Sequence, residues 1–493
     1  MTELNPLFFS DPFIRPSSPF IPPSLIPAPL KPELEPNTPV IPQSQPSDGK
    51  PQIVQNLLDL DNPSVIVYRN STPTSVCKGP DIKIPILNLE IKNASNESEF
   101  SVNCVSTYPT HAPYAPIADR FEIRFFKDSF ILTLTDGCGL HPSSRLAPKA
   151  AIEGFWDYLS PKLKEDPDRF DIHKLGNYFK SALKAAHFNI YWDAFSRSQE
   201  GFASLKNNVC EVLNNIDEGS DYECLTKVLK LRKSNLLQEV ELIKKALEGD
   251  LEARKDLVKK NLASKFYEDY AGATTFMCSA LLKSSGAEDF PYYLLTLNLG
   301  DGQCFVMRSG TLMEMTKDTR ADMSNVRDPG GKIGLCTPHP LKMDPRNLQF
   351  SLTPCQSDDL LLFMTDGVLD NINPERLGIC PQGQNTPYWV QEKIKEAGQI
   401  TTEELSELLK LLDFEEMTWK QVPLKKANGA KKLFVNHFLE LLAQKGDTPE
   451  ESNQNIIDFC TQITEGHRDK SSSFYEEPLG KPDHTTCLTY KVP

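Results

Sequence analysis

Two matching segments limit the folds open to this chain more than anything else in its sequence. They are ILTLTDG at residues 131–137 and LLLFMTDG at residues 360–367, and in both an apolar run ends in Thr-Asp-Gly. Aliphatic, β-branched and aromatic runs of this length are typical of strands, and the glycine permits a tight turn or the close approach of another backbone. Asp-Gly is also a frequent turn dipeptide, so one such segment alone would indicate only a turn. Two of them predict that separate strands deliver Asp136 and Asp366 to one place.

Length and composition indicate a globular protein. The chain has 493 residues, of which 39% are hydrophobic, which is adequate for at least one large core. Its formal net charge is −14. Phosphate groups repel an acidic protein, so we expect neither nucleic acid nor an anionic membrane surface as the main partner. Twelve cysteines form no Cys-x-x-Cys pair and no zinc-type spacing, which favours reduced, mostly buried thiols.

The N-terminal sequence gives an expectation about localisation. MTELNPLFFSDPFIRP carries acidic residues and prolines, where a secretory signal has a basic stretch followed by an unbroken apolar one. No run in the sequence has the length and apolarity of a membrane-spanning helix. We therefore expect a cytoplasmic or nuclear protein.

Residues 1–50 differ in composition from the rest of the chain. Thirteen of these fifty residues are proline, and proline cannot be accommodated in a helix interior or a central strand. We expect a disordered proline-rich tail. Its PxxP-like spacing fits an SH3 or WW domain as a partner, and a solvated linker is the alternative that composition leaves open.

From residue 51 to residue 493 we expect one domain of the α+β class. Strand-like segments occur within residues 53–135, helical periodicity follows at 147–195, a second group of strands spans 272–368, and a last strand closes the chain at 483–492. Strands and helices that are segregated in this way predict sheet packed on sheet with helices outside. Charged helical segments at about 205–260 and 385–470 are expected inserts, which are either lids and docking surfaces or simply solvated faces.

Three further aspartates stand at strand ends. They are Asp119 before one predicted strand, Asp301 after another, and Asp483 before the last. No lysine or arginine is evident as a matching partner, so the five carboxylates would repel one another if the fold brought them together. A hard divalent cation, Mg²⁺ or Mn²⁺, would resolve this repulsion, because oxygen ligands without histidine or cysteine suit these ions better than zinc. A pair of such ions activates water for the hydrolysis of a phosphate ester.

The order of these motifs resembles the metal-dependent protein phosphatase family known as PP2C, and most of all its divergent eukaryotic branch of PP2C-like domain proteins. The resemblance covers residues 101–493. It implies a β-sandwich of two antiparallel sheets flanked by α-helices and a centre of two Mg²⁺ or Mn²⁺ ions that hydrolyses phosphoserine and phosphothreonine in a phosphoprotein substrate. The motifs are Ala-Asp at 118–119, Asp-Gly-Cys-Gly at 136–139, Gly-Ala-Thr at 272–274, Leu-Gly-Asp-Gly at 299–302, Thr-Asp-Gly-Val-Leu-Asp at 365–370 and Pro-Asp-His at 482–484.

The same resemblance implies a role for each acidic residue. Asp136 would bridge the two ions, and the carbonyl of Gly137 would bind one of them. Asp366 and Asp483 would hold the other ion, which makes Asp136, Asp366 and Asp483 the expected catalytic set. Asp119 would bind through water.

Four more positions follow from the family pattern. Asp301 would contribute to a weaker third ion. Gly272 and Thr274 belong to a strand beneath the site and would be structural, as would Asp370.

Several positions depart from that pattern. Ala118 stands where the family has glutamate, Tyr114 where it has the arginine that binds the substrate phosphate, and Cys138 where it has the histidine proposed as general acid. His484 replaces an asparagine. The phosphate-binding residue is therefore unknown, and loss of a general acid typically costs about a hundredfold to ten-thousandfold in rate.

These departures leave two functional hypotheses. A protein serine/threonine phosphatase, weak or specialised, is favoured by the retained carboxylates, with His111 or His141 as a substitute acid. The alternative is an inactive PP2C-like pseudophosphatase that acts as a regulatory or interaction module. A cysteine-dependent phosphatase is rejected, because its mechanism needs cysteine and arginine six positions apart, whereas Cys138 and Arg145 are seven apart.

Overall fold

The structure is a computed structural model, and several predictions fall on residues that it does not describe. These are the disordered tail at 1–50, most of the helical segment at 205–260, and the positions of His111, Tyr114 and His141. Residues Gly49–Pro493 form one unit. The described residues are 52–53, 75–79, 86–92, 99–108, 117–126, 129–139, 142–166, 170–198, 242, 245–246, 248–261, 271–284, 290–316, 320, 322–323, 325, 328–336, 342–468 and 479–493.

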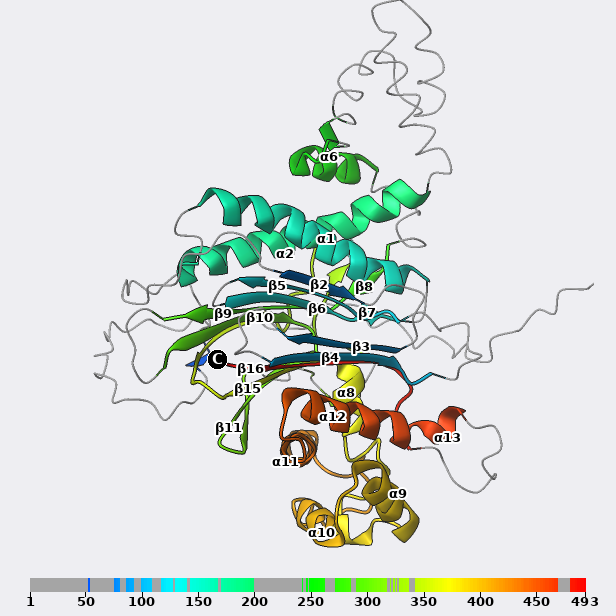
Figure 1. Cartoon of the computed structure of the whole chain (residues 1–493). Helices are drawn as coiled ribbons and strands as arrows, with labels where there is room; N and C mark the ends of the chain where they lie inside the picture. Colours follow the sequence, from blue (N-terminus) through cyan, green and yellow to red (C-terminus); the bar gives the residue numbers. More distant parts are fainter. Residues whose placement is uncertain are drawn as a thin grey trace, which may run out of the picture. The chain divides into compact units, whose positions relative to one another are not determined.

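Two antiparallel sheets form the centre of the unit (Figure 1). One has seven strands in the order β1-β14-β10-β9-β6-β5-β2, the other has six in the order β12-β11-β15-β16-β4-β3, and a small third sheet joins β13, β8 and β7. The strands are β1 (Gln52–Ile53), β2 (Ser75–Gly79), β3 (Ile86–Lys92), β4 (Glu99–Ser106), β5 (Arg120–Phe126), β6 (Ser129–Thr135), β7 (Gly137–Cys138), β8 (Ala273–Thr274), β9 (Phe276–Lys283), β10 (Tyr292–Leu299), β11 (Gln303–Arg308), β12 (Thr311–Glu314), β13 (Ile333–Gly334), β14 (Gln349–Cys355), β15 (Leu360–Met364) and β16 (His484–Lys491).

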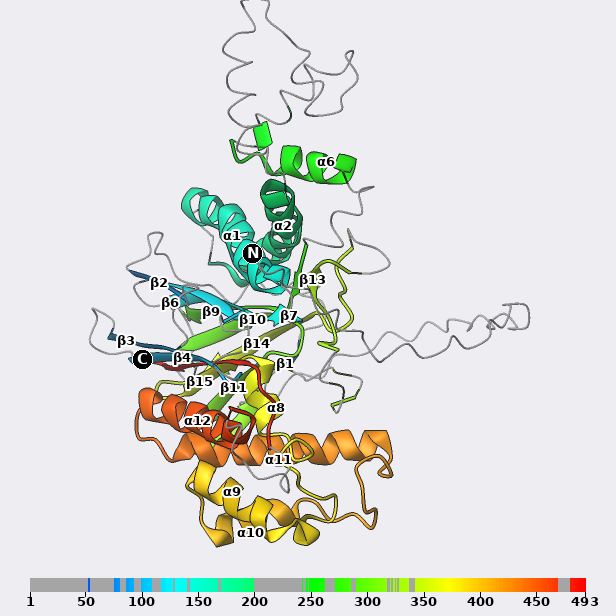
Figure 2. The same cartoon turned by 90° about the vertical axis from the view of Figure 1, so that its right-hand side faces the viewer.

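Helices cover the outer faces of the two large sheets (Figures 1 and 2). The pair α1 and α2 lies over the seven-stranded sheet, and α8, α11 and α12 lie over the six-stranded sheet. The helices are α1 (Pro142–Glu165), α2 (Ile172–Ser198), α6 (Leu251–Asn261), α8 (Asp366–Asn371), the 3₁₀ helix η3 (Gly383–Asn385), α9 (Tyr388–Gly398), α10 (Thr402–Lys410), α11 (Leu424–Gln444), α12 (Pro449–Ile463) and α13 (Glu465–Arg468).

The core between the sheets is formed by alternate side chains of each strand, because every second residue of a strand points to the same face. Phe130, Leu132 and Leu134 of β6 point to the same face and pack in one cluster with Leu361 and Phe363 of β15. The rings of Phe130 and Phe363 meet edge to face, with centroids 6.2 Å apart. These apolar runs therefore fix the two Thr-Asp-Gly strands on opposing sheets.

The outer faces of the same strands are covered as well. Ile131 of β6 packs in a second cluster with residues of α1 and α2, whereas Leu360, Leu362 and Met364 of β15 pack in a third cluster with residues of α8 to α12. Both faces of each strand are thus covered, which explains why β15 is continuously apolar; in β6, Ile131 shares the outer face with Thr133 and Thr135.

The predicted fold class is confirmed: two antiparallel sheets are flanked by α-helices in a mixed α+β arrangement. Helices α9 to α13 lie within the predicted helical segment at 385–470, and α6 lies at the end of the segment at 205–260. None of the helices in the described part of the chain is long and apolar enough to cross a membrane.

Candidate metal centre

The five predicted aspartates all lie at the ends of strands from the two large sheets. Their positions are directly after β6 for Asp136, in the turn between β10 and β11 for Asp301, directly before β5 for Asp119, at the first residue of α8 after β15 for Asp366, and directly before β16 for Asp483. Strand ends of both sheets thus supply the carboxylates.

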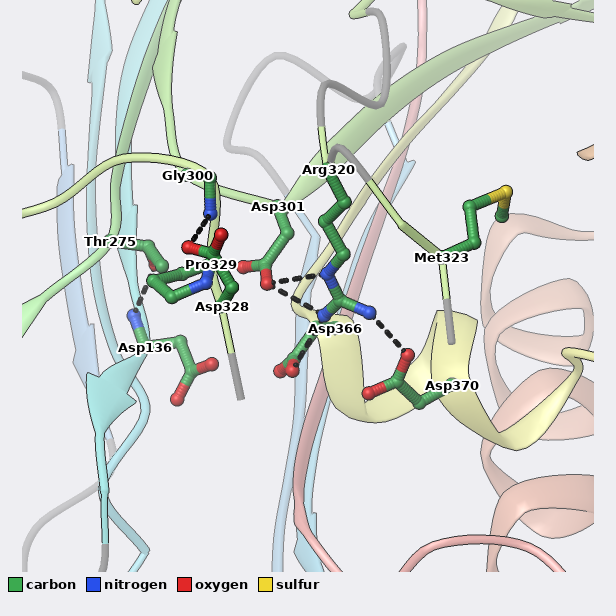
Figure 3. A network of polar contacts seen from close by, with 12 residues as sticks. Asp136, Thr275, Gly300, Asp301, Arg320, Met323, Asp328, Pro329, Asp366 and Asp370 are labelled. Carbon is green, nitrogen blue, oxygen red and sulfur yellow. Dashed lines mark hydrogen bonds and ion pairs between the residues drawn. The ribbon is translucent and has the colours of Figure 1, made fainter. Parts of the chain in front are cut away.

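The fold brings these aspartates together. One oxygen from each of Asp136, Asp301 and Asp366 lies within 4.8 Å of the others, and the same holds for Asp366, Asp370 and Asp483. Asp366 therefore belongs to both groups and joins them. Figure 3 shows Asp136, Asp301, Asp366 and Asp370 directed toward one region.

Each Thr-Asp-Gly glycine is required by a backbone that passes close to it. A Cβ atom on Gly137 would lie 1.9 Å from the carbonyl oxygen of Ser144 in α1 and 3.2 Å from the Cβ of Ala118. On Gly367 it would lie 2.1 Å from the carbonyl oxygen of His484. Only glycine allows these approaches, which bring the segments that carry Asp119 and Asp483 against the two Thr-Asp-Gly turns.

The backbone of Asp136 is held by the segment beneath it. Its carbonyl oxygen accepts hydrogen bonds from the Thr274 hydroxyl at 2.6 Å and from the Thr275 amide at 2.9 Å. Its amide donates to the Thr275 hydroxyl at 3.1 Å, the contact drawn in Figure 3. Thr274 thus holds the backbone that carries the Asp136 carboxylate.

Asp119 is fully buried and held through one oxygen only. Its Oδ2 accepts hydrogen bonds from the hydroxyls of Thr365, at 2.9 Å, and Thr486, at 2.7 Å. The Thr486 amide in turn donates to the Thr365 hydroxyl at 3.0 Å. Three strand ends are thereby tied together around this carboxylate.

The expectation that no lysine or arginine accompanies the aspartates is wrong. The Arg320 guanidinium contacts Asp301 at 2.6 Å, Asp366 at 3.0 Å and Asp370 at 2.7 Å (Figure 3). The Lys481 ammonium contacts Asp366 at 3.2 Å, Asp370 at 2.9 Å and Asp483 at 2.5 Å. The cluster therefore contains two of the chain's own cations.

Burial and mutual repulsion control the protonation of the carboxylates nearest β6. Burial raises the pKa of Asp136 well above its usual range, and the carboxylates of Asp366 and Asp119 raise it further. Burial also raises the pKa of Asp119. In the absence of an added cation, protons are therefore retained between these groups.

The carboxylates near the basic side chains are shifted in different directions. Burial raises the pKa of Asp301 to about 7, although Arg320 opposes the shift. Burial raises the pKa of Asp483 to about 6 against the opposing effect of Lys481. For Asp366 burial also favours the neutral form, but Lys481 and Arg320 together hold its pKa below the usual range. Asp366 thus stays ionised.

Two buried carboxylate oxygens lack a hydrogen-bond partner among the residues described. They are Oδ1 of Asp119 and Oδ1 of Asp366. An unsatisfied buried polar atom is costly, and hard divalent ions prefer exactly such oxygen ligands. The residues present on the Asp136 side of the cluster therefore fit a Mg²⁺ or Mn²⁺ ion.

Three of the positions that depart from the family pattern lie within the described residues. Ala118 is buried against Gly137. Burial, assisted by Asp301, raises the pKa of the Cys138 thiol to about 12, so this cysteine is not a thiolate nucleophile at neutral pH. The ring of His484 packs edge to face against Tyr108, with centroids 5.1 Å apart.

Sequence reasoning missed both basic residues for different reasons. Lys481 stands two positions before Asp483, so its place at a strand end was a usable signal. Arg320 lies 19 residues after Asp301, outside every strand and helix. Nothing in the local pattern indicates that it enters the cluster.

No family model matches the chain, and no curated protein matches it. Among solved structures, similar chains include the S. agalactiae serine/threonine phosphatase, with 10% identity and a TM-score of 0.34, which covers 80% of this chain and 100% of that chain. The catalytic domain of the serine/threonine phosphatase PstP in complex with two manganese ions has 14% identity and a TM-score of 0.32, over 80% and 97% of the two chains. The photosystem II phosphatase PBCP has 9% identity and a TM-score of 0.36, over 80% and 99%. At such values, a functional assignment depends on the residues of the cluster itself.

Proposed function

We propose that this protein is a metal-dependent phosphatase that hydrolyses phosphoserine and phosphothreonine in protein substrates. The observation that carries the proposal is the meeting of Asp136 and Asp366, from opposing sheets, beside two buried carboxylate oxygens without partners. A bound ion would give those oxygens the partner that a buried polar atom normally has. The order of the sequence motifs points to the same chemistry.

The chain's own residues would divide the work as follows. Asp136, Asp366 and Asp483 would hold divalent ions, with the Gly137 carbonyl as a further oxygen ligand. When bound, such ions polarise the phosphoryl group and activate water. Asp119 is fixed through Oδ2 and has Oδ1 without a partner, so Oδ1 would be free to orient the attacking water and accept its proton.

Protonation of the leaving alcohol is the weak step in this arrangement. Cys138, with a pKa of about 12, is too weak an acid to donate a proton efficiently near neutral pH. We therefore expect slow turnover of a phosphothreonine peptide. An aryl phosphate such as p-nitrophenyl phosphate, whose leaving group needs no proton, should be hydrolysed faster.

The test is phosphate release by the purified full chain from a phosphothreonine peptide with Mn²⁺, with Mg²⁺ and with EDTA. Turnover should require a divalent ion and should be lost in Asp136→Asn. The control is Asp328→Asn, because Asp328 pairs with Arg346 in an exposed contact. Metal-independent turnover, or full activity in Asp136→Asn, would contradict the proposal. Mn²⁺ binding without turnover of either substrate would favour the pseudophosphatase alternative.

A further inference from the structure

Arg320 lies between three carboxylates of the cluster. Its Nε and Nη2 both donate to Oδ2 of Asp301, at 2.9 and 2.6 Å. Nη2 also donates to Oδ2 of Asp366 at 3.0 Å, and Nη1 donates to Oδ1 of Asp370 at 2.7 Å. Figure 3 shows the guanidinium enclosed by these three side chains.

The Arg320 guanidinium is held in this position. The Arg320 side chain is only 5% exposed, and a guanidinium is always protonated at physiological pH. Moving it would leave a buried cation without partners or leave Asp370 and Asp301 uncompensated, both of which are strongly unfavourable. Arg320 is therefore a fixed component of the cluster.

Lys481 differs from Arg320 in its freedom to move. Its side chain is 21% exposed, and it consists of a flexible four-carbon stem with a compact charge. An ion that binds Asp366 and Asp483 can displace the ammonium toward solvent. Lys481 thus competes with a divalent ion for Asp366 and Asp483, whereas Arg320 keeps its place beside Asp301.

The charges of the cluster agree with this distinction. Six carboxylates take part, and both Arg320 and Lys481 form ion pairs with members of this set; the six are Asp119, Asp136, Asp301, Asp366, Asp370 and Asp483. With Arg320 in place and Lys481 displaced by an ion, five negative charges remain, and two divalent ions would balance four of them. A third ion beside Asp301 would lie within a few ångströms of the guanidinium and would be repelled by it.

We infer that Arg320 takes the place of a third divalent ion beside Asp301, so that Asp301 is a partner of Arg320 and not a metal ligand in this chain. The inference rests on the proposed function for the presence of ions at all. It changes the ligand set that the sequence resemblance implies, and it adds Arg320 as a residue that positions both Asp301 and Asp366.

The experiment counts Mn²⁺ ions bound per chain by isothermal titration calorimetry and by the electron paramagnetic resonance signal of free Mn²⁺. We expect two ions in the wild type and three in Arg320→Gln. Arg346→Gln is the matched control, because Arg346 also bridges two aspartates, at 2.7 and 2.8 Å, but is 55% exposed. Three ions in the wild type, or no gain in a folded Arg320→Gln variant, would overturn the inference.

A second variant keeps the inference testable if Arg320→Gln does not fold. Asp301→Asn should bind as many ions as the wild type, because Asp301 is assigned to Arg320. Loss of an ion in Asp301→Asn would overturn the inference. The number of Mn²⁺ ions bound also tests the role of Arg320 separately from the proposed function. A wild type that binds no ion would contradict that function, yet a gain of one ion in Arg320→Gln would still support the role of Arg320, and no gain would refute it.

Discussion

The glycine of the first Thr-Asp-Gly turn shows how tightly single residues are fixed around the cluster. Gly137→Ala would place a Cβ atom 1.9 Å from the Ser144 carbonyl oxygen, which belongs to helix backbone and cannot give way cheaply. We expect the free energy of unfolding to fall by about 1–3 kcal/mol, the usual cost of overpacking, and Mn²⁺ binding to weaken. Urea unfolding of the full chain measures the first effect.

The control for that substitution lies in the same chain. Gly429, in the interior of helix α11, has nothing within 4 Å of its would-be Cβ. Gly429→Ala should raise the free energy of unfolding by about 0.5–1 kcal/mol, because alanine is the better helix former. If both substitutions had the same sign of effect, the close approach at Gly137 would not be the cause.

Single residues also show which parts of the site could be predicted from the sequence and which could not. Asp136 and Asp366 were recognisable because each ends an apolar strand run and precedes a glycine. Arg320 was not, because a loop position is set by the packing of distant segments and leaves no periodic pattern. The role of Thr365 and Thr486 in orienting Asp119 was likewise hidden, since threonine is common in any strand.

At the scale of elements, helix α12 supports β16, the strand that directly follows Asp483. Asn453 of α12 donates hydrogen bonds to the carbonyl oxygens of Ser101 in β4, at 3.1 Å, and Cys487 in β16, at 2.9 Å. The helix begins with a capping box in which the Thr448 hydroxyl accepts from the Glu451 amide. The cap satisfies amides that would otherwise lack partners.

Thr448→Ala should therefore lower the free energy of unfolding by about 1 kcal/mol, the typical value of such a cap. Thr448→Ser should restore most of the loss, since serine keeps the hydroxyl. The Mn²⁺ affinity should stay unchanged in both variants, because the cap is remote from the carboxylates. Urea unfolding and calorimetric titration measure the two quantities. A large loss of Mn²⁺ affinity in Thr448→Ala would show that α12 sets the geometry of the cluster directly.

Strands and helices were predictable to different degrees. The apolar runs of β6 and β15 specify strands directly. The covering of both faces of β15, one by the opposite sheet and one by helices, follows from its continuous apolarity. The short strands β7, β8 and β13 were not predictable as a separate sheet. Each has two residues, too few for a periodic signal, and their pairing depends on contacts distant in sequence.

At the scale of the whole molecule, the cluster couples folding to pH. Folding raises the pKa of Asp301 to about 7 and that of Asp483 to about 6, and it raises that of Asp136 as well. Above about pH 4 the unfolded chain has released these protons, while the folded protein still holds them. Stability from these groups therefore falls as pH rises toward 7. Asp366, whose pKa is lowered, acts oppositely and only at more acidic pH.

We expect the melting temperature in EDTA to be higher at pH 5 than at pH 8, with a smaller difference in Asp301→Asn, which lacks one of the shifted carboxyls. Added Mn²⁺ should reverse this trend, because a divalent ion binds the deprotonated carboxylates and stabilises only the folded state. The increase in melting temperature caused by Mn²⁺ should accordingly be larger at pH 8 than at pH 5. Differential scanning calorimetry of the two proteins, with EDTA and with Mn²⁺ at both pH values, measures all of these differences. An Mn²⁺-induced increase that is independent of pH would mean that the ion binds away from these aspartates, and the candidate metal centre would have to be abandoned.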